Sequence, residues 1–567
     1  MVEETSPHAE YPWLKNYPEH LDYFTQFKPK PLWSLWDEAA AKYRYRPFID
    51  FFSRTFSFDQ IDGMISRAAR GFQDLGVRPG VKVGLFLPNC PQFVVSFFGI
   101  LKAGGTVVNY SPLYAEPELL HQIEDSQTDI MVTLNLEVLY GKMARLISES
   151  RLQKLVVATM PEVLSFPKNL LFPLARMRDI ARISPDSGHI PFRQLLNNIG
   201  DYSPVDTQPT DIAVLQYTGG TTGVPKGAML SHGALYVNVL QGAGWADEIE
   251  YGQERILAVL PFFHVFALTG IMNLGIHIGA ELIVHPRFEL EAVMRDIVKK
   301  RPTFMSGIPT MFAAMNSYPK LESCDLSSLK FCLSGGAPLP GEIKSSFENI
   351  SSCNLAEGYG LTECSAVATI MPFKGLQKEG SIGLPVPGTR IVITDKDEPH
   401  KVLTVGETGE ICIEGPQLMS GYFGREEATA DTIMDGRLHT GDVGFTDEDG
   451  FTFIIDRMKD MILASGFNVF PRHVEEAIYQ HPAVEETIVI GIPDDYRGES
   501  PKAFVKLKTS SDGLSADALH TFLEERLGRH ELPSEIEFRD ELPKTSVGKL
   551  SKKELVAEEA AKHESEQ

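Results

Sequence analysis

From about residue 57, helical and strand patterns alternate along the chain. Apolar residues at helical spacing over 58–75 precede a short apolar run at 82–87, and the same order recurs at 93–103 and 106–109. Helices interleaved with short apolar strands are typical of α/β proteins, in which helices cover a largely parallel sheet. The chain of 567 residues is long enough for several such units. The pattern therefore predicts an α/β fold whose large N-terminal domain consists of layered α/β subdomains.

The pattern changes after about Gly383. Short alternating segments with glycine turns predict a small β-rich subdomain within the N-terminal domain. From about Lys459 a separate alternation predicts a small α+β C-terminal domain of about 100 residues. Its expected elements are a helix at 471–480, strands at 486–491 and 502–508, a helix at 515–526, a strand at 535–539 and a helix at 550–560.

Charge and cysteine content exclude several classes of function. Lys and Arg number 53 against 76 Asp and Glu, a net charge of −23, so nucleic acid is not an expected partner. The six cysteines show no metal-ligand spacing, and buried or idle thiols in a reducing compartment are expected. The N-terminus lacks the pattern of a secretory signal. These features predict a cytoplasmic protein.

Two segments raise the question of membrane contact. The stretch 262–280 carries no formal charge and approaches spanning length, but two histidines, an asparagine and three glycines favour a buried helix that lines an internal cavity. The stretch 164–183 mixes large apolar residues with Lys168, Arg176, Arg178 and Arg182. It fits either a peripheral contact with an anionic membrane, on its inner face, or a surface excursion that covers a core.

The most specific stretch is 217–232, YTGGTTGVPKGAMLSH, which follows an apolar strand at 212–216. Its glycines let the backbone fold around an anion and present N–H groups, and its threonines add hydroxyl donors. Lys226 adds a positive charge, so the loop is suited to a polyphosphate. It is not a Walker A loop, because Lys226 is followed by Gly227 and not by Ser or Thr.

YTGGTTGVPKG resembles the signature loop of the AMP-forming adenylating enzymes, a superfamily of acyl-CoA synthetases, nonribosomal-peptide adenylation domains and beetle luciferases. Further motifs follow in the family's order over nearly the whole chain. They are PFFHVFALTG at 261–270, SGGAPLP at 334–340, EGYGLTEC at 357–364, HTGDVG at 439–444, IDRMKDMILASGFNVFPRHVEEAI at 455–478 and LPKTSVGKLSKKEL at 542–555.

The resemblance implies roles that single residues would not reveal. Alone, Lys549 fits a solvated lysine, Asp442 a turn residue, Glu363 a surface carboxylate and His264 a satisfied core histidine. By family position, Lys549 is the mobile lysine that approaches the substrate carboxylate and the α-phosphate, and His264 is a gate beside the acyl pocket. Adenylation needs such a cation because the attacking carboxylate is already ionised and two anions must meet.

The remaining site residues are also implied by the resemblance. Mg²⁺ is expected on Glu363 with Thr218, CoA beside Gly466 and Phe467, and the pivot of the C-terminal domain at Lys459. Tyr359 is expected to offer a flat face to the purine, and Asp442 and Arg457 to bind the ribose. The full set for ATP and AMP is Thr218, Gly219, Gly220, Thr221, Thr222, Gly223, Lys226, Gly335, Gly336, Ala337, Tyr359, Gly360, Thr362, Asp442 and Arg457.

The variant motifs indicate a substrate class. The doubled glycine of QYTGGTTG and the segments 465–484, 493–508 and 539–549 resemble bacterial long-chain fatty acid–CoA ligases. The expected substrates are a fatty acid, ATP and CoA, with Mg²⁺ as the cofactor. A medium-chain or aryl acid–CoA ligase, a fatty acyl-AMP ligase acting on a carrier protein, and a silent lipid-binding protein are the alternatives. The expected domains are 1–456 and a mobile 457–567, with a hinge at 456–460, and a homodimer is left open.

Overall fold

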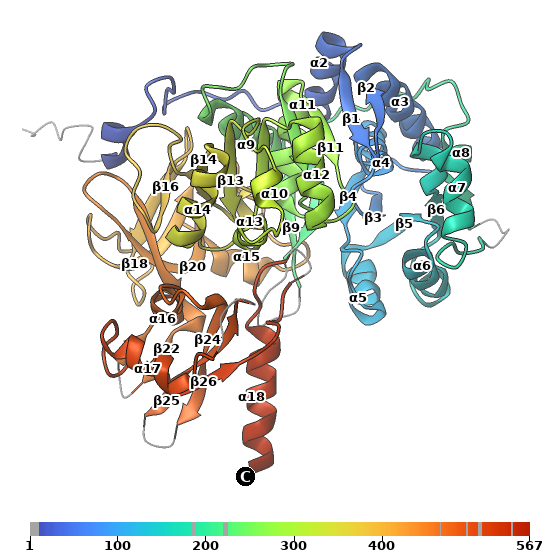
Figure 1. Cartoon of the computed structure of the whole chain (residues 1–567). Coiled ribbons are helices and arrows are strands. Elements are labelled where there is room, and N and C mark those ends of the chain that lie inside the picture. Colours follow the sequence, from blue (N-terminus) through green and yellow to red (C-terminus); the bar gives the residue numbers. More distant parts are fainter. Residues whose placement is uncertain are drawn as a thin grey trace, which may run out of the picture.

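The computed structural model describes residues 11–183, 188–218, 225–464, 467–494, 497–508, 513–545 and 548–566. Within these residues the strands form a seven-stranded, a fourteen-stranded and a five-stranded sheet. Figure 1 shows the first two sheets with their helices as one upper body, and the C-terminal segment, orange to red, below it. The predicted class, a large α/β region with a β-rich part and a small α+β region, is confirmed.

The seven-stranded sheet realises the alternation that the sequence predicts. Its neighbouring strands are parallel except for the last pair, and parallel strands need crossover connections that helices supply. The strand order is β7 (His189–Pro191), β6 (Lys154–Ala158), β5 (Thr128–Leu134), β3 (Lys82–Phe86), β4 (Thr106–Asn109), β8 (Ile212–Tyr217) and β9 (Gly227–Ser231). The helices of this region are α3 (Phe58–Asp74), α4 (Pro91–Lys102), α5 (Glu116–Ser126), α6 (Glu137–Glu149), η2 (Met160–Val163), α7 (Lys168–Ala175) and α8 (Phe192–Leu195).

The fourteen-stranded sheet joins the second α/β layer to the β-rich part. Parallel pairing of β1, β11, β10, β12, β13 and β14 gives way to antiparallel pairing at β15, so the β-rich subdomain continues the sheet. Its order is β17 (Arg390–Thr394), β18 (Gly409–Glu414), β20 (Arg437–Thr446), β21 (Thr452–Arg457), β16 (Ser381–Pro385), β15 (Thr369–Ile370), β14 (Asn354–Tyr359), β13 (Phe331–Gly335), β12 (Phe304–Gly307), β10 (Arg255–Ala258), β11 (Glu281–Val284), β1 (Pro47–Phe51) and β2 (Arg54–Ser57), with β19 (Ile433–Met434) beside β20. The other helices are η1 (Pro12–Asn16), α2 (Trp33–Tyr43), α9 (His232–Trp245), α12 (Leu290–Lys300), α13 (Pro309–Asn316), η4 (Leu321–Ser323), α14 (Gly341–Ser351), η5 (Thr362–Cys364) and α15 (Glu426–Thr432).

The uncharged stretch 262–280 is buried, as the sequence predicts, but it is not one regular helix. It consists of α10 (Val265–Ala267), the π-helical segment η3 (Leu268–Asn273) and α11 (Leu274–Ile278). The Thr269 hydroxyl donates to the Ser365 carbonyl at 2.8 Å, which ties the π segment to a neighbouring loop. No helix among the described residues combines the length and apolarity that crossing a bilayer requires.

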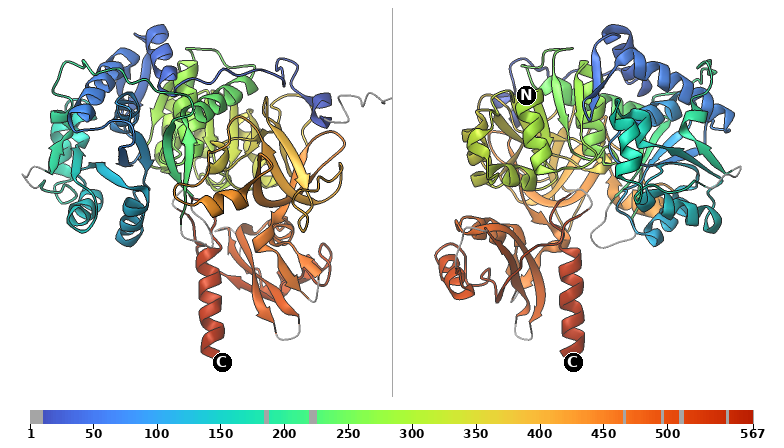
Figure 2. Two further views of the ribbon diagram at one scale, coloured as in Figure 1. Left: turned by 180° about the vertical axis from the view of Figure 1, so that it is seen from behind. Right: turned by 45° about the vertical axis from the view of Figure 1, so that its right-hand side comes forward.

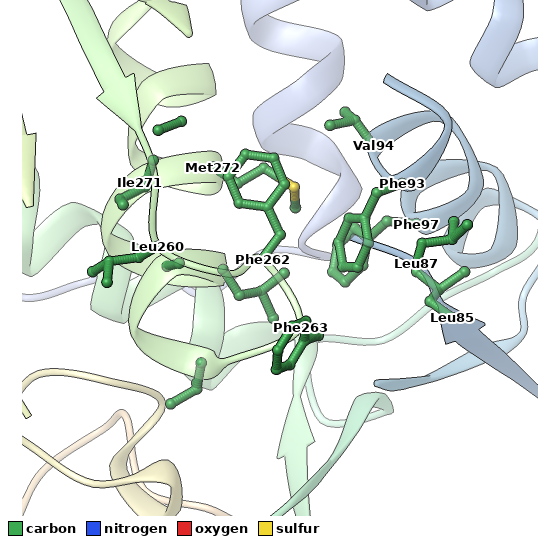
Figure 3. Packing of buried hydrophobic residues seen from close by; sticks show 14 of the residues in the cluster. Leu85, Leu87, Phe93, Val94, Phe97, Leu260, Phe262, Phe263, Ile271 and Met272 are labelled. Carbon is green, nitrogen blue, oxygen red and sulfur yellow. The ribbon is translucent and has the colours of Figure 1, made fainter. Parts of the chain in front are cut away.

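One apolar core runs between the two large sheets. Figure 3 shows Phe93 and Phe97 of α4 facing Phe262 and Phe263, which precede α10. All four rings are buried, and the Phe93 and Phe262 centroids lie 5.8 Å apart. Rings that fill a shared space this closely fix the relative position of their strands and helices. The ends of β8 and β13, where the predicted loops begin, are therefore held in place by packing.

The C-terminal sheet has an apolar core of its own, which includes Ile462, Val474 and Leu519. It is joined to β21 through the short helix η6 (Met458–Asp460). Figure 2 shows α18 pointing away from the upper body in both views. The elements are β22 (Ile462–Ala464), β23 (Phe467–Val469), α16 (Pro471–Tyr479), β24 (Val484–Asp494), β25 (Gly498–Leu507), α17 (Ala516–Glu524), β26 (Glu535–Phe538) and α18 (Lys553–Glu566).

Candidate active site

Asp442 and Arg457 face each other on the paired strands β20 and β21. The Arg457 Nε lies 3.0 Å from Asp442 Oδ1, and the Tyr359 hydroxyl donates to Asp442 Oδ2 at 2.6 Å. Burial, followed by the charge of Asp442, raises the pKa of Tyr359. The structure thus brings the two residues expected at the ribose together. It also shows that Tyr359, expected only as a flat face, anchors the aspartate through its hydroxyl.

Lys549 reaches the upper body from the C-terminal region. A Cβ on Gly336 would lie 2.6 Å from the Lys549 Nζ, so the lysine fills the space in front of this glycine. Gly336 also has φ +80°, a backbone conformation that favours glycine. The Thr545 hydroxyl accepts from the Lys549 N–H at 3.2 Å, and Thr310 donates to the Gly548 carbonyl at 3.2 Å. These contacts hold the lysine at the loop expected to bind adenine.

Lys549 and two other basic groups act on one another electrostatically. Burial, followed by the charge of Arg457, lowers the pKa of Lys549 to about 8. Burial, followed by the charge of Lys549, lowers the pKa of His264 to about 3, so the imidazole is neutral. Among the described residues no carboxylate forms an ion pair with Lys549. The arrangement suits anionic ligands, because their charge would replace the solvation that burial has removed.

Glu363, expected to bind Mg²⁺, is held by a residue that the sequence did not reveal. The Tyr422 hydroxyl donates to Glu363 Oε1 at 2.6 Å. The Nζ of Lys226 lies 5.0 Å from the centroid of the Tyr422 ring, a cation–π distance. Tyr422 therefore connects the expected metal ligand with the lysine expected at the polyphosphate. No motif pointed to it, since it lies far from Glu363 in the chain.

The stem of the Gly/Thr loop is closed by the hairpin of β8 and β9. The Thr218 N–H donates to the Lys226 carbonyl at 3.0 Å. Just before it, the Tyr217 hydroxyl donates to Asp125 Oδ2 at 2.6 Å, and Arg425 forms an ion pair with the same carboxylate. No motif in the sequence indicates this anchor either. The remaining predicted loop residues lie outside the described ones: Gly219, Gly220, Thr221, Thr222 and Gly223.

The other predicted nucleotide residues lie where the backbone approaches its neighbours closely. A Cβ on Gly335 would lie 3.1 Å from the ring of Phe266, and one on Gly360 would overlap the Ala366 carbonyl oxygen. Ala337 follows Gly336 in the same loop, and Thr362 begins η5. Close packing of glycines at the ends of β13 and β14 leaves backbone, and not side chains, at this edge of the sheet.

An apolar cavity begins next to this edge. Its free interior is small, about 50 Å³, it opens to solvent, and it is lined mainly by aromatic and aliphatic side chains of α9, η3, α11 and β13. Phe266, which packs against Gly335, is part of the lining. The His264 Nδ1 accepts from the Phe266 N–H at 3.3 Å, which fixes the imidazole at the start of α10. The 262–280 stretch thus lines a cavity, as the sequence predicts.

The residues expected at CoA and at the hinge lie in the C-terminal region. Gly466 is outside the described residues, and the Phe467 backbone begins β23, which pairs with β22. Lys459 is the central residue of η6, between Arg457 of β21 and the C-terminal sheet. Burial, followed by the charge of Arg457, lowers the pKa of Lys459. The expected pivot therefore lies two residues beyond the Asp442–Arg457 ion pair.

Comparisons with known proteins identify the family of the chain. The family model of AMP-binding enzymes matches residues 36–423, and that of the AMP-binding enzyme C-terminal domain matches 473–549. The chain is 40% identical to a long-chain-fatty-acid–CoA ligase of Bacillus subtilis (strain 168), over 98% of this chain and 99% of that protein. It is 37% identical to the ligase of the same name from Escherichia coli O157:H7, over 96% and 97% of the two chains. A feruloyl-CoA synthase of an Amycolatopsis species is 32% identical over 88% of this chain and 93% of that protein.

Solved structures show the same fold. The O-succinylbenzoate coenzyme A synthetase of Bacillus subtilis, in complex with ATP and magnesium ion, has a TM-score of 0.76 at 25% identity, covering 93% of this chain and all of that one. The anthranilate CoA ligase in complex with anthranoyl-AMP has a TM-score of 0.84 at 24% identity, covering 96% of this chain and all of that one.

Proposed function

The chain belongs to the AMP-binding enzyme family, and we propose that it is an AMP-forming long-chain fatty acid–CoA ligase. In this reaction a fatty carboxylate attacks the α-phosphorus of ATP and displaces pyrophosphate, and the CoA thiol then attacks the acyl carbon and displaces AMP. The relatives of that name support the substrate class. The observation that carries the proposal is the position of Lys549 against Gly336, in electrostatic contact with Arg457 of the Asp442–Arg457 pair.

Adenylation in this site relies on charge and position, not on a general base. The attacking carboxylate is ionised near neutral pH, so no proton has to be removed. Lys549, with a pKa of about 8 in the free site, is largely charged at neutral pH and can lie between the carboxylate and the α-phosphate. Arg457 and Asp442 would orient the ribose, and neutral His264 would stand at the mouth of the acyl cavity. Fixed cations aimed at developing charge are the main source of catalysis in phosphoryl transfer.

The residues present fit a magnesium ion. Glu363 offers a carboxylate whose Oε1 is already oriented by Tyr422, and Thr218 offers a hydroxyl at the stem of the Gly/Thr loop. Both are hard oxygen donors of the kind that Mg²⁺ accepts, alongside phosphate oxygens. Bound there, Mg²⁺ would neutralise charge on the phosphates of ATP. A relative crystallised with ATP and magnesium ion supports this assignment.

Thioester formation needs a different arrangement of the C-terminal region. The position of Lys549 against Gly336 supports an adenylating orientation of the C-terminal region in this structure. By family position, Gly466 and Phe467 line the path of CoA, and they lie on a separate segment of the same region. A turn of residues 457–567 against 1–456, with Lys459 at the pivot, would bring the second segment to the adenylate. The short η6 helix between two sheets supports this location for the hinge.

The cavity beside Phe266 supports a fatty substrate. Its lining carries few polar groups, and hydrophobic lining favours an alkyl chain over a charged or hydroxylated one. The chain would enter past His264 with its carboxylate toward Lys549. A feruloyl-CoA synthase among the relatives makes an aryl acid the main competing substrate.

A screen of acids decides between these functions. Pyrophosphate release and thioester formation are measured with octanoate, laurate, palmitate and ferulate, each with and without CoA. We expect the highest kcat/KM with palmitate or laurate, and thioester only when CoA is present. A preference for ferulate would make the chain an aryl acid ligase. Acyl-adenylate without transfer to CoA would make it an acyl-AMP ligase that serves a carrier protein.

We also propose that the surface around α7 binds an anionic bilayer. Phe166, Leu170, Leu171, Leu174 and Met177 are 55% to 77% exposed, and α7 has no buried residue. A segment that merely covered a core would bury these side chains. Their exposure therefore favours contact with a membrane over the alternative that the segment only covers a core. The basic residues of the same stretch provide attraction to anionic lipid in a chain of net charge −23.

A second segment contributes to this surface. The Lys168 Nζ donates to the Phe52 carbonyl at 2.8 Å, and Phe52, in the turn between β1 and β2, is 46% exposed. The contact holds the turn beside α7, so that the apolar surface combines residues distant in sequence. Arg176 forms a salt bridge with Asp179 at 3.2 Å, which weakens its contribution to lipid binding.

Co-sedimentation with vesicles tests the proposal. We expect binding to vesicles that contain phosphatidylglycerol, weaker binding to phosphatidylcholine alone, and release by salt. Near a charged bilayer each basic residue contributes roughly 1 kcal/mol. Changing Leu170 and Leu174 to Ser should abolish binding, whereas the same change at Val402 and Val405, also exposed, should not. The membrane proposal would be refuted if binding did not change in Leu170→Ser/Leu174→Ser, in Arg176→Gln/Arg178→Gln/Arg182→Gln or with added salt. The stretch 164–183 would then be a surface segment that only covers a core.

A further inference from the structure

Sulfur, nitrogen and oxygen donors meet on the strand pair β18–β20, next to the segment of β20 that carries Asp442. Glu410 and Cys412 lie two residues apart on β18, and Cys412 pairs with His439 of β20. The His439 Nδ1 is 2.8 Å from Glu410 Oε2 and 3.4 Å from Cys412 Sγ. All three residues are at most 9% exposed. In the part of the chain that the structure describes, no other set of three such residues has its donor atoms within 4.8 Å of one another.

We propose that Glu410, Cys412 and His439 form a binding site for a thiophilic divalent cation of the Zn²⁺ class. Thiolate, imidazole and carboxylate are the usual protein ligands of Zn²⁺, which binds them at about 2.0–2.3 Å. Donors of a tetrahedral site are then about 3.3–3.6 Å apart. The sulfur–nitrogen separation already has this value, and the oxygen–nitrogen separation has to open by about half an ångström. A thiolate ligand selects against Mg²⁺, so the site is distinct from that of Glu363.

Binding requires that protons leave the site. Burial raises the pKa of the Cys412 thiol to about 12, so the free protein holds a neutral S–H there. When the cation binds, the thiol proton passes to solvent and the sulfur forms the metal bond. The His439 Nδ1 must bind in its unprotonated form, and Glu410 exchanges its hydrogen bond with His439 for the cation. The proton that the thiol releases makes apparent affinity increase with pH.

Two polar side chains at the surface lie within electrostatic reach of the site. His400 Nδ1 lies 2.7 Å from Asp435 Oδ2, and both side chains are largely exposed. The hydrogen bond with His400 is the largest cause that lowers the pKa of Asp435, and the charge of His439 is a smaller one. A carboxylate and an imidazole therefore lie at the surface within electrostatic reach of the buried histidine.

Occupancy of the site would act on the nucleotide pocket, an effect that rests on the proposed function. Glu410 Oε1 accepts the Gly441 N–H at 2.9 Å, and Gly441 immediately precedes Asp442. The pairing of β18 with β20 shifts register just here, so the bulged segment 440–442 of β20 depends on this carboxylate for support. If Glu410 moves toward a cation, this segment moves with it. We therefore expect the bound cation to inhibit adenylation.

The absorption spectrum of added Co²⁺ tests the site in the purified full chain. A thiolate bound to Co²⁺ gives an intense near-ultraviolet charge-transfer band, and tetrahedral coordination gives visible bands. We expect both, at one Co²⁺ per chain, reversed by Zn²⁺. Cys412→Ala and His439→Gln should each abolish the thiolate band or weaken Co²⁺ binding at least tenfold. Cys353→Ala, which removes another buried thiol, should leave the spectrum unchanged.

The outcomes separate the site from its effect. A wild-type spectrum without a thiolate band, or a band that persists in a folded Cys412→Ala variant, would overturn the site. Cys412→Ser, closer in size, repeats the test if the alanine variant unfolds. Zn²⁺ should inhibit pyrophosphate release by the wild type at least tenfold more strongly than by Cys412→Ala. A cobalt band with equal Zn²⁺ inhibition of the two proteins would support the cation site but overturn its coupling to Asp442. A chain that is inactive with every acid would refute the proposed function, and the cobalt spectrum would still test the cation site.

Discussion

The two halves of the active site are held in very different ways. Asp442, Tyr359 and Arg457 come from the large sheet, and Glu363 is fixed by Tyr422, each through hydrogen bonds of 2.6 to 3.0 Å. Lys549 comes from a loop of the C-terminal region, fastened to the upper body near it by the Thr310–Gly548 hydrogen bond. The first group is held by hydrogen bonds within the upper body, whereas Lys549 reaches the same place from the C-terminal region.

This difference suggests that the side chains assigned to the nucleotide have to keep their positions, whereas Lys549 has to be able to move. In the proposed mechanism the groups assigned to the nucleotide serve both half-reactions, and they are paired with protein partners. Lys549 would serve only one half-reaction, and burial, which lowers its pKa to about 8, disfavours its charge in the absence of an anion. A charge held in this way is stabilised mainly by its substrate, so that it can leave when the substrate has been converted. The following changes test that contrast.

The largest effect should come from removing the delivered charge. Lys549→Ala is expected to slow adenylation about 10²–10³-fold, because one cation at the developing charge is lost. Thioester formation from pre-made acyl-adenylate should be nearly normal. Pyrophosphate release from palmitate and ATP, and a separate assay with isolated adenylate, measure the two steps.

Lys544→Ala is the matched control for Lys549→Ala, since Lys544 belongs to the same loop but binds Glu486 at 2.7 Å. It should leave adenylation within a few-fold of the wild type. Near-normal pyrophosphate release by Lys549→Ala would remove the lysine from its assigned role.

The next effect should come from stopping the movement. Lys459→Pro fixes φ near −65° at the proposed pivot and should hold the C-terminal region in the adenylating orientation. Acyl-adenylate should still form, while thioester formation from isolated adenylate falls roughly 10²-fold, as expected when a reacting segment is misplaced. Lys459→Ala keeps the torsion free and should affect both steps mildly. Equal loss of both steps in a folded proline variant would place the pivot elsewhere.

A smaller effect should come from loosening the fixed half. Tyr422→Phe removes only the hydroxyl that donates to Glu363, and a hydrogen bond to a charged group is worth about 1.5–3 kcal/mol. We expect about a tenfold weaker apparent affinity for Mg²⁺·ATP, with the rate at saturation less affected. Tyr23→Phe, which loses a buried hydroxyl bonded to the Thr389 carbonyl, should change stability but not the magnesium dependence. An unchanged magnesium titration in Tyr422→Phe would show that Glu363 needs no such support.

The effect that is smallest near neutral pH comes from the titration of Lys549. Lys549 is charged below its pKa of about 8 and loses that charge as pH rises, so kcat/KM for adenylation should fall about tenfold per unit above pH 8. Bound anions restore the charge, so kcat should fall only at higher pH. Because the folded pKa lies below the unfolded value of 10.5, this group makes the folded state relatively more stable as pH rises from 8 to 10.5. Lys549→Arg should remove the limb near pH 8, and a limb that persists there would belong to another group.

Much of the fold was predictable because each pattern is local. The helix over 58–74 and the strands 82–86 and 106–109 follow from apolar periodicity and lie within a residue of their predicted bounds at nearly every end. The continuity of the β-rich part with the central sheet was not predictable, since pairing of β14 with β15 depends on contacts between strands, not on either sequence alone. The π segment at 268–273 was missed for the same reason.

In the active site, too, residues within local motifs were predictable, whereas residues that depend on distant partners were not. The motifs indicated Asp442, Arg457, Glu363, Gly336 and Lys549, and the geometry now relates them. Tyr422 and Asp125 were not found, because their importance lies in partners 59 and 92 residues away, Glu363 and Tyr217. A tyrosine or aspartate in a loop has no pattern that distinguishes support of a site from ordinary surface chemistry.

The missing side chain of Gly336 has a consequence for the lifetime of the intermediate. Acyl-adenylate is a mixed anhydride, and water destroys it at the expense of one ATP. While Lys549 fills the space before Gly336, that side of the pocket is occupied by protein, and bulk water is kept from it. In the proposed reaction, the adenylate would be exposed to water from the withdrawal of Lys549 until the arrival of the thiol. The ATP lost to hydrolysis of the adenylate would then depend on how quickly the lysine leaves Gly336 and the thiol replaces it.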